Sequence, residues 1–160
     1  MLFEEIFREL NKRRIDYVVV GGVAVVMHGV VRLTADLDLM VHLEEKNLTK
    51  FVEVMNELGY KPKVPVKTES LIDPENRRAW IEEKNMRVFS FYHPKKGIML
   101  IDIFINEPVS YNKIKEDSIK MKMGNLLIPT VSIEDLIKLK KISGRPQDMA
   151  DIEALKRLGK

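Results

Sequence analysis

The sequence predicts an α+β domain in which a mixed sheet is flanked by helices, with a small helical piece at the C-terminus. Its 160 residues, 45% of them hydrophobic, suit one domain with a sizeable core. Strand-like and helix-like segments do not simply alternate, which favours a mixed sheet over a regular βαβ arrangement. We expect a core over residues 1–130 and a helical extension over residues 131–160, packed on the same domain.

Composition narrows the classes of protein that this chain can belong to. It contains no cysteine, which excludes disulfides and thiolate metal sites and fits a reducing cytoplasm. The net charge of +3 permits a phosphate-bearing partner without requiring one. No uninterrupted apolar run approaches about 18 residues, and the amphipathic N-terminus does not resemble a signal peptide. We therefore expect a cytoplasmic protein with no membrane span.

The first third of the chain reads as two helix–strand pairs and a further helix. An amphipathic helix is predicted over residues 2–13, and a buried β-branched strand over residues 16–20. A short helix over residues 23–30, a strand over residues 36–42 and a helix over residues 46–58 follow. The stripe that predicts the first helix consists of Leu2, Ile6, Phe7 and Leu10.

The remaining elements are predicted from caps and turns. Asp73-Pro74 is typical of a helix start, with the helix running to about residue 84. Residues 86–92 and 98–105 are two strands joined by the turn HPKKG, and residues 120–128 form a second, small hairpin. The last two helices are predicted from Ser132, with a capping box to Asp135, through Leu139, and from Pro146 to Leu158.

The most informative segment is VVVGGVAVVMHGVVRLTADLDLMV, residues 18–41. Acid-x-acid patterns occur three times in the chain, so the spacing alone is not specific. The pair Asp36 and Asp38 differs in context because it lies in an apolar strand. The period of two places both carboxylates on one face of that strand, where they repel each other.

Such a pair needs a counter-charge, and Arg32 alone is a poor one. A divalent cation would supply it, and oxygen ligands without cysteine suit Mg²⁺ or Mn²⁺. Asp102 is the one charge in the apolar run IMLIDIFI and is the candidate third ligand. Its alternative is a place on an edge strand, facing water. Three convergent carboxylates could hold two metal ions.

Gly21-Gly22 ends the preceding strand and begins a helix. Free backbone N–H groups and close backbone approach at such a bend favour phosphate binding. A glycine pair alone is more often an ordinary turn. Followed by an acidic pair on the next strand, it fits a site for a metal–triphosphate complex.

With these motifs the sequence resembles the nucleotidyltransferase superfamily that includes DNA polymerase beta. The matching residues are Gly21-Gly22, the segment Asp36-Leu37-Asp38 and Asp102. The arginine and threonine before the acidic pair are similar to the minimal members and to the abortive-infection toxin (AbiEii-like) type. The C-terminal run SIEDLIKLKKISGRPQDMADIEAL is similar to the tail of the same group, with matches at Lys140, Arg145, Asp148 and Asp151.

The resemblance implies the polymerase-beta-type nucleotidyltransferase fold and transfer of an NMP group from a nucleoside triphosphate to an acceptor hydroxyl. Asp36 and Asp38 would bind both metal ions, and Asp102 would complete the site and help to deprotonate the acceptor through the first metal. One departure concerns Val23, because many members have a serine at this position that donates its hydroxyl to a phosphate.

The nucleotide-binding candidates each have a structural alternative. Arg32 and Thr34 would contact phosphates or brace the loop, and an ordinary surface arginine is an equal alternative. Lys140 is a triphosphate ligand by resemblance and a solvated side chain by composition. Arg145 would bind substrate or pair with Asp148 and Asp151 to hold the last helix.

Three functions remain open at this point, of which one is a plain metal-binding structural domain. The first is an active enzyme whose acceptor is RNA, a protein or a small molecule such as an aminoglycoside. The second is a catalytically silent nucleotide-binding or regulatory module, such as one half of a toxin–antitoxin pair with a partner protein. The turn HPKKG and the pair Arg77-Arg78 are candidate nucleic-acid contacts.

Overall fold

The computed structural model describes residues 3–158, so Leu2 of the predicted first stripe lies outside the described residues. Within them the chain forms a mixed sheet with the strand order β3-β4-β5-β2-β1-β7-β6. The strands are β1 (Tyr17–Val20), β2 (Leu37–Val41), β3 (Lys61–Pro62), β4 (Val88–Tyr92), β5 (Leu100–Phe104), β6 (Ile119–Met123) and β7 (Leu126–Thr130). The helices are α1 (Glu4–Lys12), α2 (Gly21–Met27), α3 (Glu45–Leu58), the 3₁₀ helix η1 (Thr68–Ile72), α4 (Pro74–Lys84), α5 (Tyr111–Glu116), α6 (Ile133–Ser143) and α7 (Pro146–Leu158).

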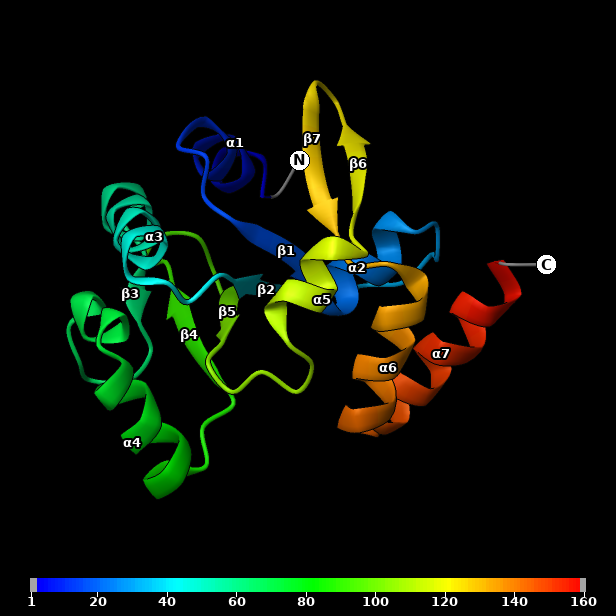
Figure 1. Ribbon diagram of the computed structural model, residues 1–160. Coiled ribbons are helices and arrows are strands. Elements are labelled where there is room, and N and C mark those ends of the chain that lie inside the picture. Colours follow the sequence, from blue (N-terminus) through cyan, green and yellow to red (C-terminus); the bar gives the residue numbers. More distant parts are fainter. Residues whose placement is uncertain (1–2, 159–160) are drawn as a thin grey trace.

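Two parallel contacts make the sheet mixed. β2 runs parallel to β5, and β1 runs parallel to β7, whereas the other neighbours are antiparallel. Helices lie around this sheet, and the β6–β7 hairpin projects from one end of it (Figure 1). The predicted α+β architecture with a mixed sheet is confirmed.

One face of β2, β4 and β5 packs on helices and forms the main core. Phe51 of α3 meets Phe91 edge to face, with ring centroids 6.0 Å apart, and Trp80 of α4 packs on Phe89 at 5.2 Å. Along β4 and β5 the buried residues alternate with half-exposed or exposed ones. The opposite face of these strands is therefore more open, and we call it the open face.

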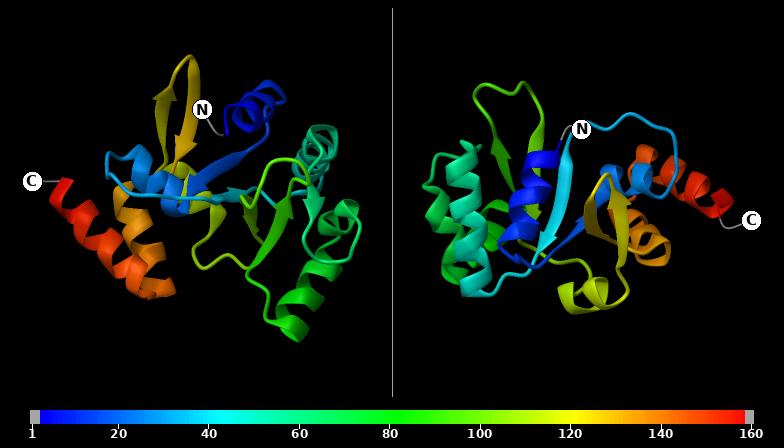
Figure 2. Two further views of the ribbon diagram at one scale, coloured as in Figure 1. Left: turned by 180° about the vertical axis from the view of Figure 1, so that it is seen from behind. Right: turned by 90° about the horizontal axis from the view of Figure 1, so that it is seen from above.

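The C-terminal helices cover a different part of the molecule. α6 and α7 lie side by side at the end opposite α3 and α4 in all views (Figures 1 and 2). α6 also packs against α2. β7 ends at Thr130 and α6 begins at Ile133; the division of the chain at residue 130 remains a prediction. No helix among the described residues is long and apolar enough to cross a membrane.

Most predicted elements lie where the sequence placed them. α4 begins at Pro74 with Asp73 as its cap, since the Asp73 carboxylate accepts from the N–H of Glu75 at 2.9 Å. Ser132 caps α6 by accepting from the N–H of Asp135 at 3.1 Å. That helix continues past Leu139 to Ser143, where Gly144 ends it in a left-handed conformation.

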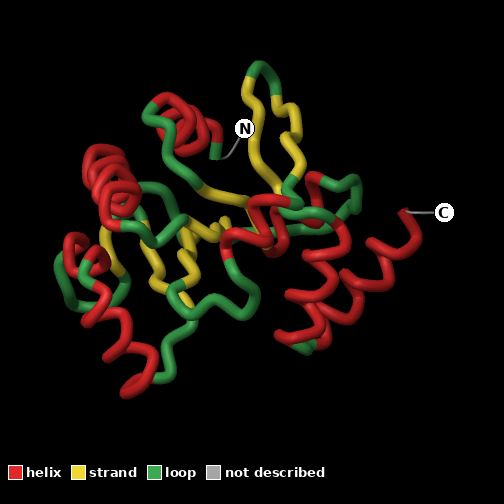
Figure 3. Tube along the Cα trace, viewed as in Figure 1, coloured by secondary structure: helices red, strands yellow, loops and turns green. Residues whose placement is uncertain are grey.

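The structure differs from the sequence prediction at the start of one helix and in three short elements. α2 begins at the glycine pair itself instead of at residue 23. The sequence prediction missed α5, the two-residue strand β3 and η1, because each is too short to show a hydrophobic period. A long loop, drawn green in Figure 3, joins α2 to β2 and carries the RLTAD segment.

Candidate active site

The acidic residues of the sequence motif lie along two neighbouring strands on the open face. In the parallel β2–β5 pair, Asp38 is the register partner of Asp102, so the two carboxylates are cross-strand neighbours. Asp36 comes just before β2, and its Oδ1 accepts from the N–H of Leu100 at 3.1 Å. The structure therefore brings the three predicted acids to one region of the sheet.

Ser90 completes this row of side chains and was missed from the sequence. It is the register partner of Asp102 in the antiparallel β4–β5 hairpin, and its hydroxyl donates to Asp102 Oδ1 at 2.6 Å. The signal was available in principle, because Ser90 is a small polar residue between two phenylalanines in the run MRVFSFY. Locating it opposite Asp102 requires the register of the hairpin, which the sequence does not specify.

The acidic row is electrostatically unfavourable without a counter-ion. Burial raises the pKa of the Asp38 carboxyl to about 7, and the negative charges of Asp102 and Asp36 act in the same direction. Burial also raises the pKa of Asp102, while the Ser90 hydrogen bond and the charge of Lys63 act against this increase. A cation placed between these carboxylates would relieve both the desolvation and the repulsion.

The donor set fits a hard cation, although the site is not preformed. Asp38 and Asp102 offer oxygen ligands from adjacent strands, which suits Mg²⁺ or Mn²⁺. Among the described residues, no group of three or more His, Cys, Asp or Glu side chains is arranged to hold a metal ion. We infer that Asp36 does not join Asp38 and Asp102 in such a group because its carboxylate is turned toward the backbone N–H of Leu100.

The two glycines of the motif are required by contacts at the end of β1. Gly21 has φ +67°, and a Cβ there would overlap the carboxylate of Asp38. A Cβ on Gly22 would overlap the guanidinium of Arg32 and lie 2.7 Å from Oγ1 of Thr34. The glycine pair therefore allows the acidic strand and the RLTAD loop to approach the bend from two sides.

We expect Gly21→Ala to lower the free energy of unfolding by about 1–2 kcal/mol for the left-handed backbone alone, and further for the displacement of Asp38. The matched control is Gly124→Ala, since Gly124 has φ +60° and open space around it. Urea denaturation of both variants separates the two effects. Equal losses of stability in the two variants would mean that the added methyl group at residue 21 does not displace the side chain of Asp38.

The C-terminal cations form a buried network beside this bend. Lys140 is 6% exposed, and its Nζ lies 3.2 Å from Asp148 Oδ1 and 2.9 Å from Asp151 Oδ2. Arg32 reaches the same network, with Nε 3.3 Å from Asp151 Oδ1 and a buried Nη1 that has no hydrogen-bond partner in the structure. Neither residue is the solvated surface cation that composition alone allowed.

Arg145 lies at the outer rim of this network. Its Nε donates to Asp148 Oδ2 at 2.9 Å, although its side chain is 72% exposed. The predicted pairing with Asp148 is confirmed, whereas the carboxylate of Asp151 is held by other cations. Burial raises the pKa of Asp148, but hydrogen bonds from Arg145, Ser143 and Lys140 outweigh it, and the pKa lies well below its usual range.

A hollow of about 600 Å³ joins the acidic row to this network. One side carries Asp38 and Asp102, and the other carries Lys140 and Arg145 from α6 and the segment after it. The positive charges of Lys140 and Arg145 lower the pKa of Asp38, so the two sides act on each other. The other lining residues are Val20, Gly21, Arg87, Val88, Phe104, Asn106, Pro108, Leu136, Leu139, Ile142, Ser143 and Asp148.

The candidate nucleic-acid contacts named from the sequence do not gather at this hollow. Arg77 is 9% exposed and donates to the carbonyl oxygens of Leu71 and Ile72 at 2.7 and 2.9 Å, so its role is structural. Arg78 pairs with Glu75, and Lys96 of the HPKKG turn pairs with Glu5 at 3.0 Å.

A carboxylate pair opposite a cationic wall, next to a glycine bend, is the arrangement expected of a nucleotidyltransferase. The family described as "Nucleotidyl transferase of unknown function (DUF2204)" matches residues 2–160. The chain belongs to this nucleotidyl transferase family. As a member of it, the protein is a transferase, and the sequence-based resemblance to nucleotidyltransferases is confirmed. The narrower resemblance to abortive-infection toxins remains a prediction.

Solved structures of nucleotidyltransferases share the fold of this family member. They include the lincosamide antibiotic adenylyltransferase LnuA with lincomycin bound, at a TM-score of 0.62 and 20% identity over 96% of this chain and 93% of that chain. The antibiotic-resistance factor ANT(2'')-Ia, in complex with adenylyl-2''-tobramycin, matches with a TM-score of 0.62 and 12% identity over 96% of this chain and 85% of that chain. A nucleotidyltransferase-like protein of Thermotoga maritima, TM1012, matches with a TM-score of 0.59 and 16% identity over 95% of this chain and 88% of that chain. No curated protein matches the sequence significantly.

Proposed function

We propose that this nucleotidyltransferase moves an NMP group from a nucleoside triphosphate to an acceptor hydroxyl in a reaction that depends on Mg²⁺ or Mn²⁺. The observation that supports it most directly is the cross-strand pairing of Asp38 with Asp102 beside Gly21. A bound divalent ion would act there as a Lewis acid on the phosphate and would neutralise the carboxylates. Asp36, Asp38 and Asp102 are the proposed ligands.

The chain's own groups then have defined tasks. The backbone at Gly21 and Gly22 lets the triphosphate approach closely, while Arg145 and Lys140 place positive charge on the opposite wall of the hollow. Arg32 and Thr34 brace the loop against Gly22 and can contact a phosphate from there. Val23 is 7% exposed and points into the core, so phosphate contacts at this bend come from backbone amides.

The proposed transfer follows an in-line displacement. The acceptor hydroxyl oxygen forms a bond to the α-phosphorus, and the bond from that phosphorus to the bridging oxygen of the β-phosphate breaks. Pyrophosphate leaves with that oxygen, and the hydroxyl proton passes to the Asp102 carboxylate. Ser90 positions this carboxylate through its hydrogen bond.

The test is transfer of radiolabel from each α-³²P-labelled nucleoside triphosphate to RNA, to protein and to small-molecule acceptors. We expect labelled product and pyrophosphate with Mg²⁺ or Mn²⁺, and loss of both products when EDTA removes the metal. Calorimetry with Mg²⁺ and each triphosphate provides an independent binding measurement.

The second candidate is a catalytically silent nucleotide-binding module, which acts with a partner protein as half of a toxin–antitoxin pair. Val23 in place of serine favours it, because one side-chain phosphate contact is missing. Triphosphate binding without label transfer to any acceptor would decide for this candidate. Absence of both binding and transfer would refute both functions.

A further inference from the structure

A row of side chains leads across the open face from the sheet edge to the acidic pair. At the edge, the N–H of Lys63 donates to the carbonyl of Ser90 at 2.9 Å, which places Lys63 opposite Ser90 just beyond β3. Ser90 is the register partner of Asp102, and Asp102 is that of Asp38. Cross-strand partners share a face of the sheet, so this row begins with a lysine and ends at the proposed catalytic carboxylates.

A second row runs beside the first. Lys61 of β3 is the register partner of Tyr92, and Tyr92 is that of Leu100. The N–H of Leu100 in turn donates to the Asp36 carboxylate. Tyr92 is 37% exposed, so part of its ring is available on the open face. Each of the two rows therefore connects an exposed edge lysine to one end of the acidic motif.

The lysines belong to the segment KPKVPVK, residues 61–67, whose first two residues form β3 at one edge of the sheet. Its exposed residues alternate with half-buried ones, so that Lys61, Lys63 and Lys67 all face solvent. In an extended chain, residues two apart are separated by roughly 7 Å. Lysines and prolines on an edge strand also prevent pairing with other chains. That role does not require two of the lysines to be in register with catalytic strands.

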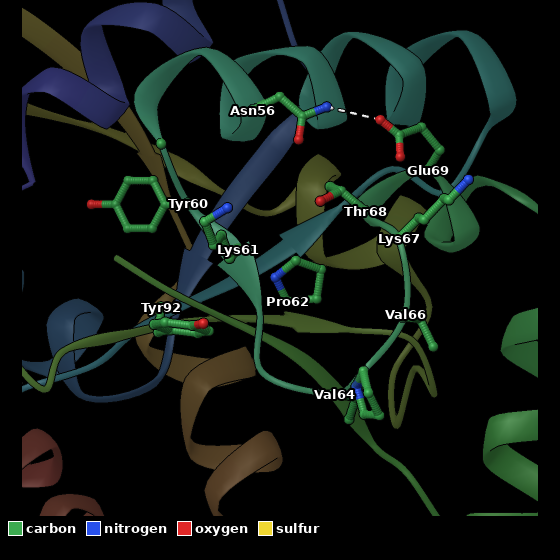
Figure 4. A pocket seen from close by; sticks show the side chains of 12 residues that line it. Asn56, Tyr60, Lys61, Pro62, Val64, Val66, Lys67, Thr68, Glu69 and Tyr92 are labelled. Carbon is green, nitrogen blue, oxygen red and sulfur yellow. Dashed lines mark hydrogen bonds between the residues drawn. The ribbon is translucent and has the colours of Figure 1, made fainter. Parts of the chain in front are cut away.

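A hollow of about 550 Å³ lies against this edge and shares Lys61 and Tyr92 with the open face. Figure 4 shows Lys61 and Tyr92 on neighbouring strands, with Lys67 on the far side of the hollow. The carboxylate that lines it is Glu69, which accepts a hydrogen bond from Asn56 at 3.0 Å (Figure 4). The charged residues that line this hollow are therefore Lys61, Lys67 and Glu69, and they lie beside the rings of Tyr60 and Tyr92.

Charge complementarity selects among acceptor classes. In the described residues that line the two hollows, the carboxylates are Asp38, Asp102, Asp148 and Glu69. The first two are the proposed metal ligands, and Asp148 is neutralised by Lys140 and Arg145. A polycationic acceptor finds little free negative charge here. An acceptor that carries phosphates finds Lys61 and Lys63 on its path to the acidic row.

We propose that the acceptor is a single-stranded nucleic acid that crosses the open face from the β3 edge, an inference that rests on the proposed nucleotidyl transfer. Backbone phosphates contact Lys61 and Lys63, a base stacks on Tyr92, and the terminal hydroxyl reaches Asp102. Two strand spacings of roughly 5 Å separate the edge from β5, which one or two nucleotides can span. Alternating cationic and aromatic contacts are typical of single-strand binding.

The test uses the full chain and a short fluorescent single-stranded RNA with a free 3′ hydroxyl. Lys61→Gln/Lys63→Gln is compared with Lys120→Gln/Lys122→Gln, an equally spaced, exposed pair on β6 at the opposite edge of the same sheet. We expect the first variant to reduce the slope of log affinity against log salt by about 1.4 and the second to leave it unchanged. Tyr92→Ala weakens binding on the order of 10-fold.

The outcomes are distinguishable from failure of the proposed function. Triphosphate binding and pyrophosphate release report that function, and RNA anisotropy reports the acceptor track. Binding of triphosphate together with label on an aminoglycoside, a lincosamide or an acidic protein, and none on RNA, overturns the inference alone. Equal RNA affinity and equal salt slope for both double variants overturn it as well. RNA binding without triphosphate binding would refute the proposed nucleotidyl transfer. It would also refute the role of RNA as the acceptor, because that role depends on the transfer.

Discussion

Asp38→Asn is expected to reduce nucleotidyl transfer by at least about 10²- to 10³-fold, the range found when one preorganised charged or polar group is removed from an active site. The asparagine keeps the shape of the side chain but cannot supply the negative charge that the proposed metal needs. Steady-state transfer assays with saturating Mg²⁺ measure the loss. Asp16→Asn is the matched control, because Asp16 is an exposed aspartate just before β1, the strand next to β2.

The same substitution is expected to stabilise the metal-free protein. The pKa of Asp38 rises from 3.8 in the unfolded reference to about 7 in the fold, so ionised Asp38 opposes folding at higher pH. The advantage of Asp38→Asn should be absent below about pH 4, grow up to about pH 7 and then level off. After allowance for solvent, a gain on the order of 1 kcal/mol corresponds to roughly 2–4 °C in Tm. Thermal unfolding in EDTA over this pH range measures it; a loss of stability at pH 8 would contradict the charge repulsion described for the acidic row.

Lys140→Met is expected to lower the free energy of unfolding by about 3–5 kcal/mol, because it leaves two buried carboxylates without their shared cation. Lys140 lies within 3.2 Å of both Asp148 and Asp151, whose side chains are 1% and 2% exposed. Urea denaturation measures the change. Transfer activity should fall as well, since Lys140 also lines the hollow.

Lys141→Met provides the control for this substitution. Lys141 is the next residue of α6, yet it is exposed, so its loss should change stability by less than about 0.5 kcal/mol. If the two variants unfolded at the same urea concentration, the buried network would contribute nothing that a solvated lysine does not. In that case Asp148 and Asp151 would be held by Arg145 and Arg32 alone.

The local part of the candidate site could be predicted from the sequence. Asp36 and Asp38 stand out because an apolar strand does not tolerate two like charges on one face without a ligand. Asp102 stands out for the same reason within its strand. Helix caps are local too, so the start of α4 at Pro74 followed from Asp73 alone.

The partners of these residues depend on contacts that are remote in the sequence. The parallel pairing of β2 with β5 sets Asp38 beside Asp102, 64 residues away. The hairpin register sets Ser90 beside Asp102, and a hydrogen bond just beyond a two-residue strand sets Lys63 beside Ser90. The convergence of Asp102 with Asp36 and Asp38 was predicted from the sequence, but no local period encodes strand register, so the neighbours Ser90 and Lys63 could not be derived.

The sequence by itself therefore indicated the resemblance to nucleotidyltransferases, the mixed α and β elements and the acidic groups that we propose carry the chemistry of this protein. The tertiary structure alone decided why Gly21 must lack a side chain, that Lys140 is buried between two aspartates, and that edge lysines align with the acidic row. The physical reason is that side-chain periodicity assigns each residue to a face, whereas strand order and register, which depend on packing of the whole chain, assign its neighbours.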